Sequence, residues 1–220
     1  MNPKKRALNP SARIRDQIEP ATIRTLAAGV LGESVVFAST PSGPEAKQNL
    51  VSTLVQAMGI VDPYGRIPPG SPPFSLYKTP LGQPCLLLED RPGPSLSFSH
   101  GKGQTWAAIC NAGSVGIDVA YPHEFAGVYP FARTFRPEEV DIVKTLGHID
   151  ISRGAALLWS AKEAAVKASG AGFNRFDPLD VRVGVPRPKV QGICFEVLAG
   201  LPIPTWATSE GPGWISIALK

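Results

Sequence analysis

The first residue whose type suggests chemistry is an aspartate inside an apolar run. Asp118 stands at the centre of residues 116–120 (GIDVA), flanked by Ile117 and Val119. A carboxylate buried in such a run must be paired with a cation or bound to a metal ion, because an unpaired buried charge is costly. Alternatively, strand alternation turns Asp118 outward while its two apolar neighbours face inward. The run alone leaves both interpretations open.

A second acidic residue stands four positions before a lysine in residues 159–167 (WSAKEAAVK). The segment has a helical pattern, so Glu163 and Lys167 share one face, with Trp159 one turn earlier on the same face. The alternative is an ordinary exposed ion pair, worth about a few tenths of a kcal/mol. Nothing within the segment excludes that alternative.

A polar step ends the predicted strand over residues 96–99 (LSFS), where Ser99 and His100 are followed by Gly101 and Gly103. Backbone N–H groups and an imidazole at such a turn can bind an anion. A plain hairpin turn is the alternative. A nucleophile–base pair for acyl transfer is disfavoured, because Ser99 and His100 are adjacent on a strand and point to opposite faces.

The composition is typical of a folded protein with a substantial core. Of 220 residues, 43% are apolar and 18% are charged, which excludes wholesale disorder. The net charge of +4 favours an anionic partner, whether nucleic acid, a phosphorylated ligand, anionic lipid or an acidic protein. Cys85, Cys110 and Cys194 have neither CxxC spacing nor nearby histidines, so we expect buried, reduced thiols rather than a zinc site.

Targeting signals are not evident in the sequence. No apolar run approaches about 20 residues, so no transmembrane segment is expected. The basic residues 1–15 are not followed by an apolar stretch, so they do not form a secretory signal. We therefore expect a cytoplasmic protein, with a loosely held arm over residues 1–25.

Helical and strand patterns alternate along the chain and must position these residues. We expect helices over 44–59, 136–146 and 152–168, and strands over 35–38, 85–88, 96–99, 106–110, 115–119, 181–185, 193–198 and 214–219. The helix over 152–168 has the strongest pattern, because Asp150 or Ser152 can cap it and Gly170 can end it. Mixed helices and strands without an internal repeat predict an α+β fold.

Together, these motifs resemble the 4′-phosphopantetheinyl transferase superfamily, in particular its larger monomeric type that activates peptide and polyketide synthases. The family pattern is a G-[IV]-D step, then roughly 40–45 residues, then [FW]-[SCT]-x-K-E-[AS]-x-x-K. Residues 116–118 and 159–167 fit this pattern, and Asp118 and Glu163 are 45 positions apart. Upstream, residues 82–84 (GQP) and 98–100 (FSH) are similar to the family's G-K-P and S-H elements.

The resemblance covers residues 82–172 and implies a particular architecture. Members of this type have two similar α+β halves related by a pseudo-twofold axis, with coenzyme A in the cleft between them. We expect the chain to divide near residues 111–114, into an N-terminal half over 1–112 and a C-terminal half over 113–220 that carries the catalytic motifs.

The resemblance also implies the reaction. A serine of an acyl or peptidyl carrier protein attacks the phosphorus attached to pantetheine, and 3′,5′-ADP leaves. Asp118 and Glu163 would be the Mg²⁺ ligands, since magnesium prefers hard oxygen ligands. Glu163 would also take the serine proton, directly or through water, and Lys167 would neutralise the pyrophosphate.

The remaining motif residues would bind coenzyme A. By the same resemblance, Lys162 and His100 would contact its phosphates and Ser99 would support that contact. Gln83 and Pro84 would lie near the adenine.

Two positions depart from the family pattern. Ala120 stands where members often carry a third metal-binding glutamate, so we expect weaker metal binding rather than loss of activity. Gln83 replaces a lysine and removes one positive charge. Arg13, Arg15 and Arg24 are candidates for the 3′-phosphate of coenzyme A, although no motif supports them.

The implied partners are coenzyme A and an acidic carrier protein, whose encounter a basic surface would speed. The chain is long enough to hold both halves, so we expect a monomer without nucleic-acid or membrane partners. The alternative is a catalytically impaired homologue that binds coenzyme A or a carrier protein, which Ala120 alone favours. A nucleic-acid-binding module would need an ordered basic stripe, whereas the basic residues are scattered and cluster only at 4–6.

Overall fold

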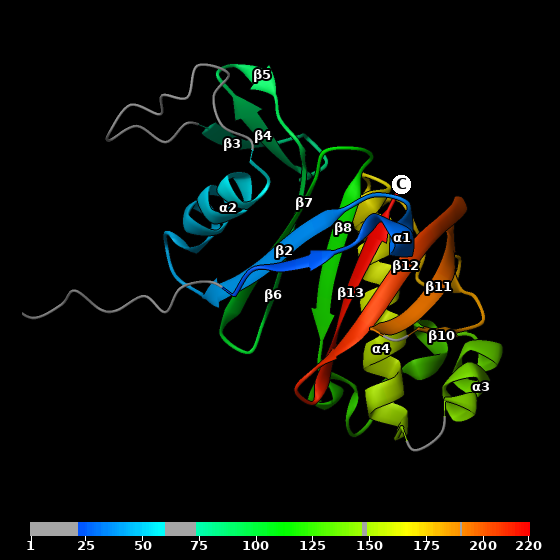
Figure 1. The fold of residues 1–220 in the computed structure, drawn as a ribbon. Coiled ribbons are helices and arrows are strands. Elements are labelled where there is room, and N and C mark those ends of the chain that lie inside the picture. Colours follow the sequence, from blue (N-terminus) through cyan, green and yellow to red (C-terminus); the bar gives the residue numbers. More distant parts are fainter. Residues whose placement is uncertain (1–21, 60–73, 147–148, 190) are drawn as a thin grey trace, which may run out of the picture.

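The computed structural model describes residues 22–59, 74–146, 149–189 and 191–220. They form an α+β fold of three antiparallel sheets and a few helices (Figure 1). The α-helices are α1 (Ala28–Leu31), α2 (Ala46–Ala57), α3 (Pro137–Thr145) and α4 (Ile151–Ala168), and the 3₁₀ turns are η2 (Pro122–Phe125), η3 (Phe131–Arg133) and η4 (Gly172–Asn174).

The first sheet is built from residues before position 111. Its strand order is β1-β2-β7-β6, with β1 (Arg24–Leu26), β2 (Val35–Pro41), β6 (Ser95–Gly101) and β7 (Gln104–Cys110). A small sheet of β3 (Phe74–Lys78), β4 (Pro84–Leu88) and β5 (Arg91–Pro92) lies beyond it. Helix α2 covers the first sheet through an apolar cluster that includes Leu50, Leu54 and Ile109.

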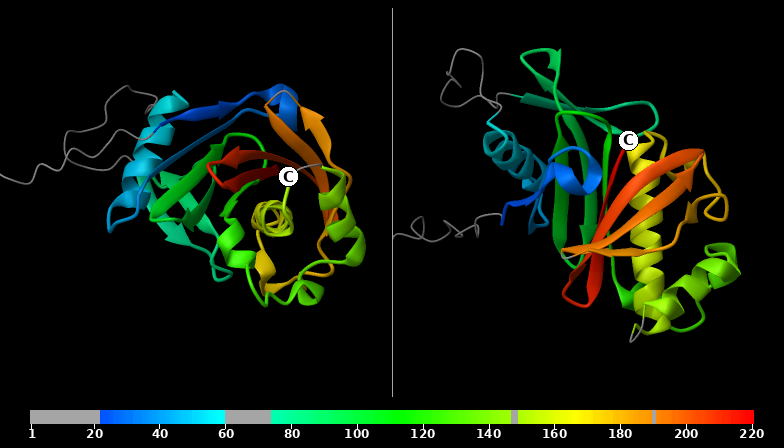
Figure 2. Two further views of the ribbon diagram at one scale, coloured as in Figure 1. Left: turned by 90° about the horizontal axis from the view of Figure 1, so that it is seen from below. Right: turned by 45° about the vertical axis from the view of Figure 1, so that its right-hand side comes forward.

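The second large sheet is built from residues after position 114. Its order is β10-β11-β12-β13-β8, and β9 also pairs with β11. The strands are β8 (Val115–Ala120), β9 (Arg182–Val183), β10 (Arg187–Lys189), β11 (Gly192–Ala199), β12 (Leu201–Glu210) and β13 (Gly213–Leu219). Figure 2 shows α4 along one face of this sheet, and α3 packs against α4, where Val143 lies against Gly154. Leu157, Leu158 and Ala161 of α4 are buried in the core that results.

The two large sheets meet along the edge strands β6 and β8. Each is the last strand in the order of its sheet, and serine side chains of β6 bond to backbone N–H groups of β8. A second apolar cluster, with Phe37, Trp106, Ile117 and Trp206, fills the space between the sheets. The strands that carry Ser99 and Asp118 therefore lie at the joint of the molecule.

The sequence predicted the three longest helices and most of the strands. Asp150 caps α4 by accepting a hydrogen bond from the backbone N–H of Arg153 at 2.9 Å, and Gly170 follows its end with φ 81°. The predicted alternation of helix and strand is thus confirmed as an α+β fold, while the pseudo-twofold relation of two halves and the division near residues 111–114 stay predictions. Residues 1–21 of the predicted arm lie outside the described part of the chain, but Arg24 and Thr25 belong to β1 and pair with β2, so the arm does not extend to residue 25.

The longest strand, β12, was not predicted, because Pro202 and Pro204 interrupt its pattern. Both prolines pair with β11 on one side, but the pairing of β12 with β13 begins only at Thr205. At Pro202 and Pro204, β12 therefore has a partner strand on one side only, and the missing proline N–H groups cost no hydrogen bond on the other side. Proline disfavours a strand that is paired on both sides, but not a segment that is paired on one side.

The cysteines match the expectation of buried thiols in part. Cys85, Cys110 and Cys194 are all free, but only Cys110 is buried, and the other two are half-buried. Among the helices of the described residues, none has both the length and the apolar character needed to cross a membrane.

Candidate active site

Helix α4 lies close against strand β8 because residue 116 is a glycine. A Cβ atom placed on Gly116 would overlap the carbonyl oxygen of Ala164 and lie 2.7 Å from the backbone nitrogen of Ala168. A larger residue fits only if the helix moves away. The close approach brings the next inward-facing residue of the strand, Asp118, against the last turns of the helix.

Three charged side chains meet at this contact. Lys167 Nζ lies 2.7 Å from Asp118 Oδ1 and 3.8 Å from Glu163 Oε2, so the two carboxylate oxygens are no farther apart than the sum of these distances. The Asp118 side chain is 8% exposed, whereas those of Glu163 and Lys167 are 24% and 27% exposed. Asp118 therefore does not point outward, and Glu163 and Lys167 are more than an exposed surface pair.

The position of Glu163 makes its carboxyl group hard to ionise. Burial raises its pKa and the nearby Asp118 carboxylate raises it further, to about 7, although the Lys167 ammonium opposes the rise. Two carboxylates in one partly dry site repel each other unless a cation or a shared proton lies between them. The same pKa suits a general base that works near neutral pH.

Ser99 faces this cluster rather than a phosphate site. Its hydroxyl donates to Asp118 Oδ1 at 2.9 Å and accepts from the backbone N–H of Val119 at 3.1 Å. Because a hydroxyl has one proton to donate, this arrangement leaves none for a ligand. The expected role of Ser99 in supporting a coenzyme A phosphate is corrected to that of a partner of Asp118.

A pocket of about 230 Å³ opens beside the cluster. His100, Gln83 and Pro84 line it together with Lys167, so the structure brings these four predicted residues to one place. The remaining lining residues come from α2, β3, β6, the turn after β3 and the segment after α4, and are Lys47, Lys78, Leu81, Gly82, Leu96, Ser97, Phe98, Gly170 and Gly172.

The wall of this pocket is positively charged. Three lysines line it, and no Asp or Glu is among its lining residues. Burial lowers the pKa of His100, and the charges of Lys47, Lys167 and Lys78 lower it further. A cluster of cations that depresses the pKa of a histidine is suited to bind an anion of several charges.

Sequence reasoning missed Lys47 and Lys78. Lys47 belongs to α2 and its ammonium lies 5.4 Å from the centre of the Phe98 ring, while Lys78 ends β3. Neither residue stands in a motif, and only the positive net charge pointed to such groups. Of the arginines proposed for this role, Arg24 is bound to Glu210 at 2.8 Å and lines a different pocket. Arg13 and Arg15 lie outside the described residues.

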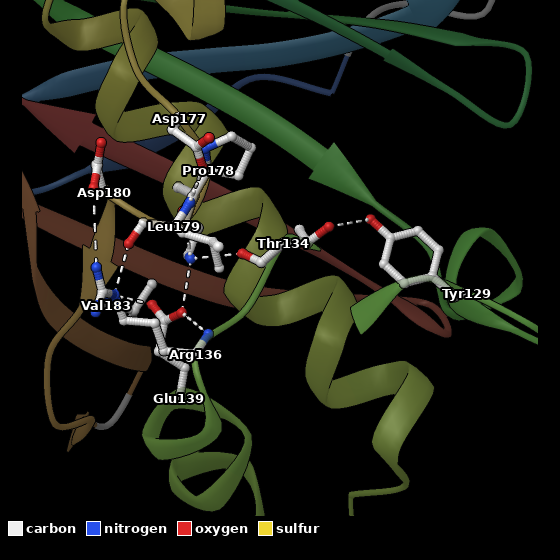
Figure 3. Close-up of polar contacts among 10 residues, drawn as sticks. Tyr129, Thr134, Arg136, Glu139, Asp177, Pro178, Leu179, Asp180 and Val183 are labelled. Carbon is white, nitrogen blue, oxygen red and sulfur yellow. Dashed lines mark hydrogen bonds and ion pairs between the residues drawn. The ribbon is translucent and has the colours of Figure 1, made fainter. Parts of the chain in front are cut away.

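Lys162 does not join the pocket. Its side chain is 0% exposed, and its ammonium donates to Glu139 Oε2 at 2.7 Å and to the carbonyl oxygens of Thr134 and Pro178, each at 2.9 Å. Figure 3 shows these acceptors converging from two segments beside α4. All three protons of the ammonium are used, so the expected contact of Lys162 with a coenzyme A phosphate is wrong.

Both carboxylate oxygens of Glu139, the partner of Lys162, also have hydrogen-bond donors. Its Oε2 also accepts from the backbone N–H of Arg136 at 2.9 Å, and its Oε1 accepts from that of Val183 at 2.8 Å. Helix α3 and the segment 178–183 are therefore fastened to α4 one residue before Glu163 (Figure 3). Lys162 thus lies in the interior of the protein, while the next residue of the helix, Glu163, belongs to the charged cluster.

The carboxylates offer hard oxygen ligands for Mg²⁺. Both hydrogen bonds to Asp118 within the described residues go to Oδ1, which leaves Oδ2 for a cation shared with Glu163. Nowhere in the described ranges do three or more His, Cys, Asp or Glu residues gather into a metal site. Ala120 is fully buried in the core beneath α4 and supplies no ligand. A cation held by two carboxylates and otherwise by water and phosphate oxygens fits the habits of magnesium.

A larger pocket of about 650 Å³ lies elsewhere, between η3 and α3. Its walls include Phe131, Phe135, Val140 and Leu179, and none of the predicted site residues reaches it. Size alone would have selected this pocket, whereas the perturbed carboxyl group and the cationic wall select the smaller one.

Two comparisons found known proteins to which this chain is similar. Residues 114–210 match the family model of the 4′-phosphopantetheinyl transferase superfamily, a span from the start of β8 to the end of β12 that includes Asp118, Glu163 and Lys167. A 4′-phosphopantetheinyl transferase of Nostoc sp. (strain PCC 7120), HetI, is 24% identical over 177 residues, which cover 79% of this chain and 73% of the relative. Both findings make this chain similar to the 4′-phosphopantetheinyl transferase superfamily.

Proposed function

We propose that the protein transfers the 4′-phosphopantetheine group of coenzyme A to a serine of an apo acyl or peptidyl carrier protein, with Mg²⁺ as cofactor. The observation that carries the proposal is the cluster of Asp118, Glu163 and Lys167 beside a pocket with a cationic wall. A diphosphate ester needs charge neutralisation and positioning for its transfer, more than covalent help.

The proposed step moves one phosphoryl group between two oxygens. The carrier serine oxygen bonds to the phosphorus attached to pantetheine, and the bond from that phosphorus to the bridging oxygen breaks, releasing 3′,5′-ADP. Glu163, with its pKa near 7, takes the serine proton directly or through water. Lys167 neutralises the charge that builds on the departing phosphate.

Asp118 and Glu163 would hold the divalent cation through Asp118 Oδ2 and the Glu163 carboxylate. When bound, this ion would supply positive charge to the pyrophosphate oxygens. Without it, burial raises the pKa of Glu163 and repulsion by the Asp118 carboxylate raises it further.

The cationic pocket would hold the rest of coenzyme A. Lys47, Lys78 and His100 offer charge to phosphate groups, and Gln83 and Pro84 form a less charged wall for the adenine. Lys47 and Lys78 take the place that Arg24 was expected to fill. The positive net charge would also favour an acidic carrier protein, as electrostatic complementarity speeds encounter. We propose that the protein acts as a monomer in the cytoplasm, where its free thiols stay reduced.

One experiment tests the transfer directly. The protein is incubated with coenzyme A, MgCl₂ and each of several apo-carrier proteins, and the carriers are weighed by mass spectrometry. The expected result is a gain of one phosphopantetheine that disappears in Glu163→Gln and without divalent cations. Binding of coenzyme A without transfer to any carrier would support the alternative, a catalytically impaired homologue, which the buried Ala120 favours.

A further inference from the structure

Three serines of β6 connect the two large sheets. The hydroxyls of Ser95, Ser97 and Ser99 accept hydrogen bonds from backbone N–H groups of β8 at 2.9, 3.1 and 3.1 Å. The donors belong to Val115, Ile117 and Val119, so every pair is separated by 20 residues. A constant separation means that the two strands run parallel in one fixed register. We call these three contacts the serine ladder.

Hydroxyl groups here replace the carbonyl acceptors of an ordinary sheet. Ser97 and Ser99 are each 4% exposed, so water does not compete for the bonds. The three hydrogen bonds of the ladder form in one register, because sliding β6 by two residues would move each side chain by about 6.6 Å along the strand. A slide of one residue would turn every serine to the other face.

The contact of Ser99 differs from those of the other two serines. Besides accepting from Val119, Ser99 donates to Asp118 Oδ1 at 2.9 Å, the same oxygen that Lys167 binds at 2.7 Å. Within the described residues, neither Ser95 nor Ser97 bonds to a charged group. Two donors converging on Oδ1 fix the rotation of the carboxylate and direct Oδ2 away from both of them.

We propose that Ser99 is a positioning residue for metal binding: through the register of the serine ladder, it orients the Asp118 carboxylate so that Oδ2 is presented to the divalent cation. This inference rests on the proposed function. Partners that orient a metal ligand commonly contribute about 10-fold to 100-fold to metal affinity. The ladder also sets the distance between the cationic pocket, to which β6 contributes His100, and the carboxylates that β8 and α4 contribute.

The test compares two rungs of the same ladder. Ser95→Ala and Ser99→Ala each remove one hydrogen bond to β8, but only Ser99→Ala removes the bond to Asp118. Binding of Mn²⁺, a paramagnetic substitute for Mg²⁺, is measured by electron paramagnetic resonance in the presence of coenzyme A, and thermal unfolding is measured alongside. We expect Ser99→Ala to weaken Mn²⁺ binding by about 10-fold or more and Ser95→Ala by less than about 2-fold. Ser99→Thr, which keeps the hydroxyl, should bind Mn²⁺ more tightly than Ser99→Ala.

The outcomes separate this inference from the proposed function. Equal Mn²⁺ binding by Ser95→Ala and Ser99→Ala would overturn the role of Ser99 while leaving the transferase intact. If the unsubstituted protein bound no Mn²⁺ with coenzyme A, the metal-dependent function itself would be refuted. Should Ser99→Ala lose its native circular dichroism, Ser99→Cys takes its place, because a thiol is a weaker donor of similar size. Its Mn²⁺ affinity must then also fall below that of Ser95→Ala.

Discussion

The ammonium of Lys162 is bound to the carboxylate of Glu139 at 2.7 Å, with both side chains shielded from water. Next to it along the helix, Glu163 faces the charged cluster at β8. Lys162 therefore holds α3 and the segment 178–183 in place, whereas Glu163 belongs to the site. Substitutions at the two positions should fail in different ways.

Lys162→Met should destabilise the protein by about 3–5 kcal/mol, because it leaves the Glu139 carboxylate buried without a cation. The double variant with Glu139→Gln should recover part of this loss, because a neutral amide leaves no buried charge and its oxygen can still accept from one of the backbone N–H groups that Glu139 binds. Chemical denaturation of both variants measures the difference. If Lys162→Met kept its stability but had a raised Kd for coenzyme A, Lys162 would contact a phosphate after all, and the role given to it here would be wrong.

Glu163 should make stability depend on pH in the metal-free protein. Its pKa rises from 4.5 to about 7 on folding, so the folded state holds the proton more tightly than the unfolded state. Stability contributed by the protonated group is present below pH 4.5 and is lost as pH rises through about 7, by up to about 3 kcal/mol.

Glu163→Gln should remove this dependence, because an amide does not ionise. The free energy of unfolding of the variant, measured in EDTA, should exceed that of the parent above pH 7 and match it near pH 4.5. Parallel pH curves for the two proteins would show that Glu163 ionises without hindrance.

Gly116→Ala should separate α4 from β8. A methyl group at this position overlaps the backbone of Ala164, and overpacking of this kind costs about 1–3 kcal/mol or more. Because the helix must shift, we expect transfer activity to fall further than the melting temperature alone explains. Gly103→Ala provides a comparison, since space around that glycine is open although its φ of 71° adds local strain. Activity lost equally in both variants would argue against the close approach.

Lys47→Ala should weaken coenzyme A binding by about 10-fold, as expected for a half-buried cation that loses a charged ligand group. Lys78→Ala should have a smaller effect, about 3-fold, because Lys78 is exposed. Isothermal titration calorimetry at low salt measures both. Lys144→Ala is the control, since Lys144 is paired with Asp141 outside this pocket. If the control lost as much affinity as Lys47→Ala, general charge rather than the pocket would be responsible.

The helical part of the charged cluster could be predicted because its geometry is local. Glu163 and Lys167 are one turn apart on a helix with a clear cap at Asp150, so their shared face follows from spacing alone. Asp118 stands out because a strand of β-branched residues rarely holds a carboxylate. The family pattern then linked the two segments, whose contact depends on Gly116.

What could not be predicted depends on contacts between distant segments. The direction of Lys162 depends on α3, whose Glu139 supplies the buried partner, and no spacing rule connects positions 139 and 162. Lys47 and Lys78 reach the pocket from α2 and β3, and become neighbours of His100 only when the sheets assemble. The S-H motif likewise did not indicate that the Ser99 hydroxyl donates to Asp118.

The serine ladder divides its requirements unequally between the strands that it joins. On β8, only backbone N–H groups of Val115, Ile117 and Val119 take part, so the joint itself places no requirement on these side chains, which burial alone keeps apolar. On β6, a hydroxyl is needed at each of positions 95, 97 and 99. Among homologues that share this joint, alternating serine or threonine in β6 should persist, while positions 115, 117 and 119 of β8 should exchange one apolar residue for another.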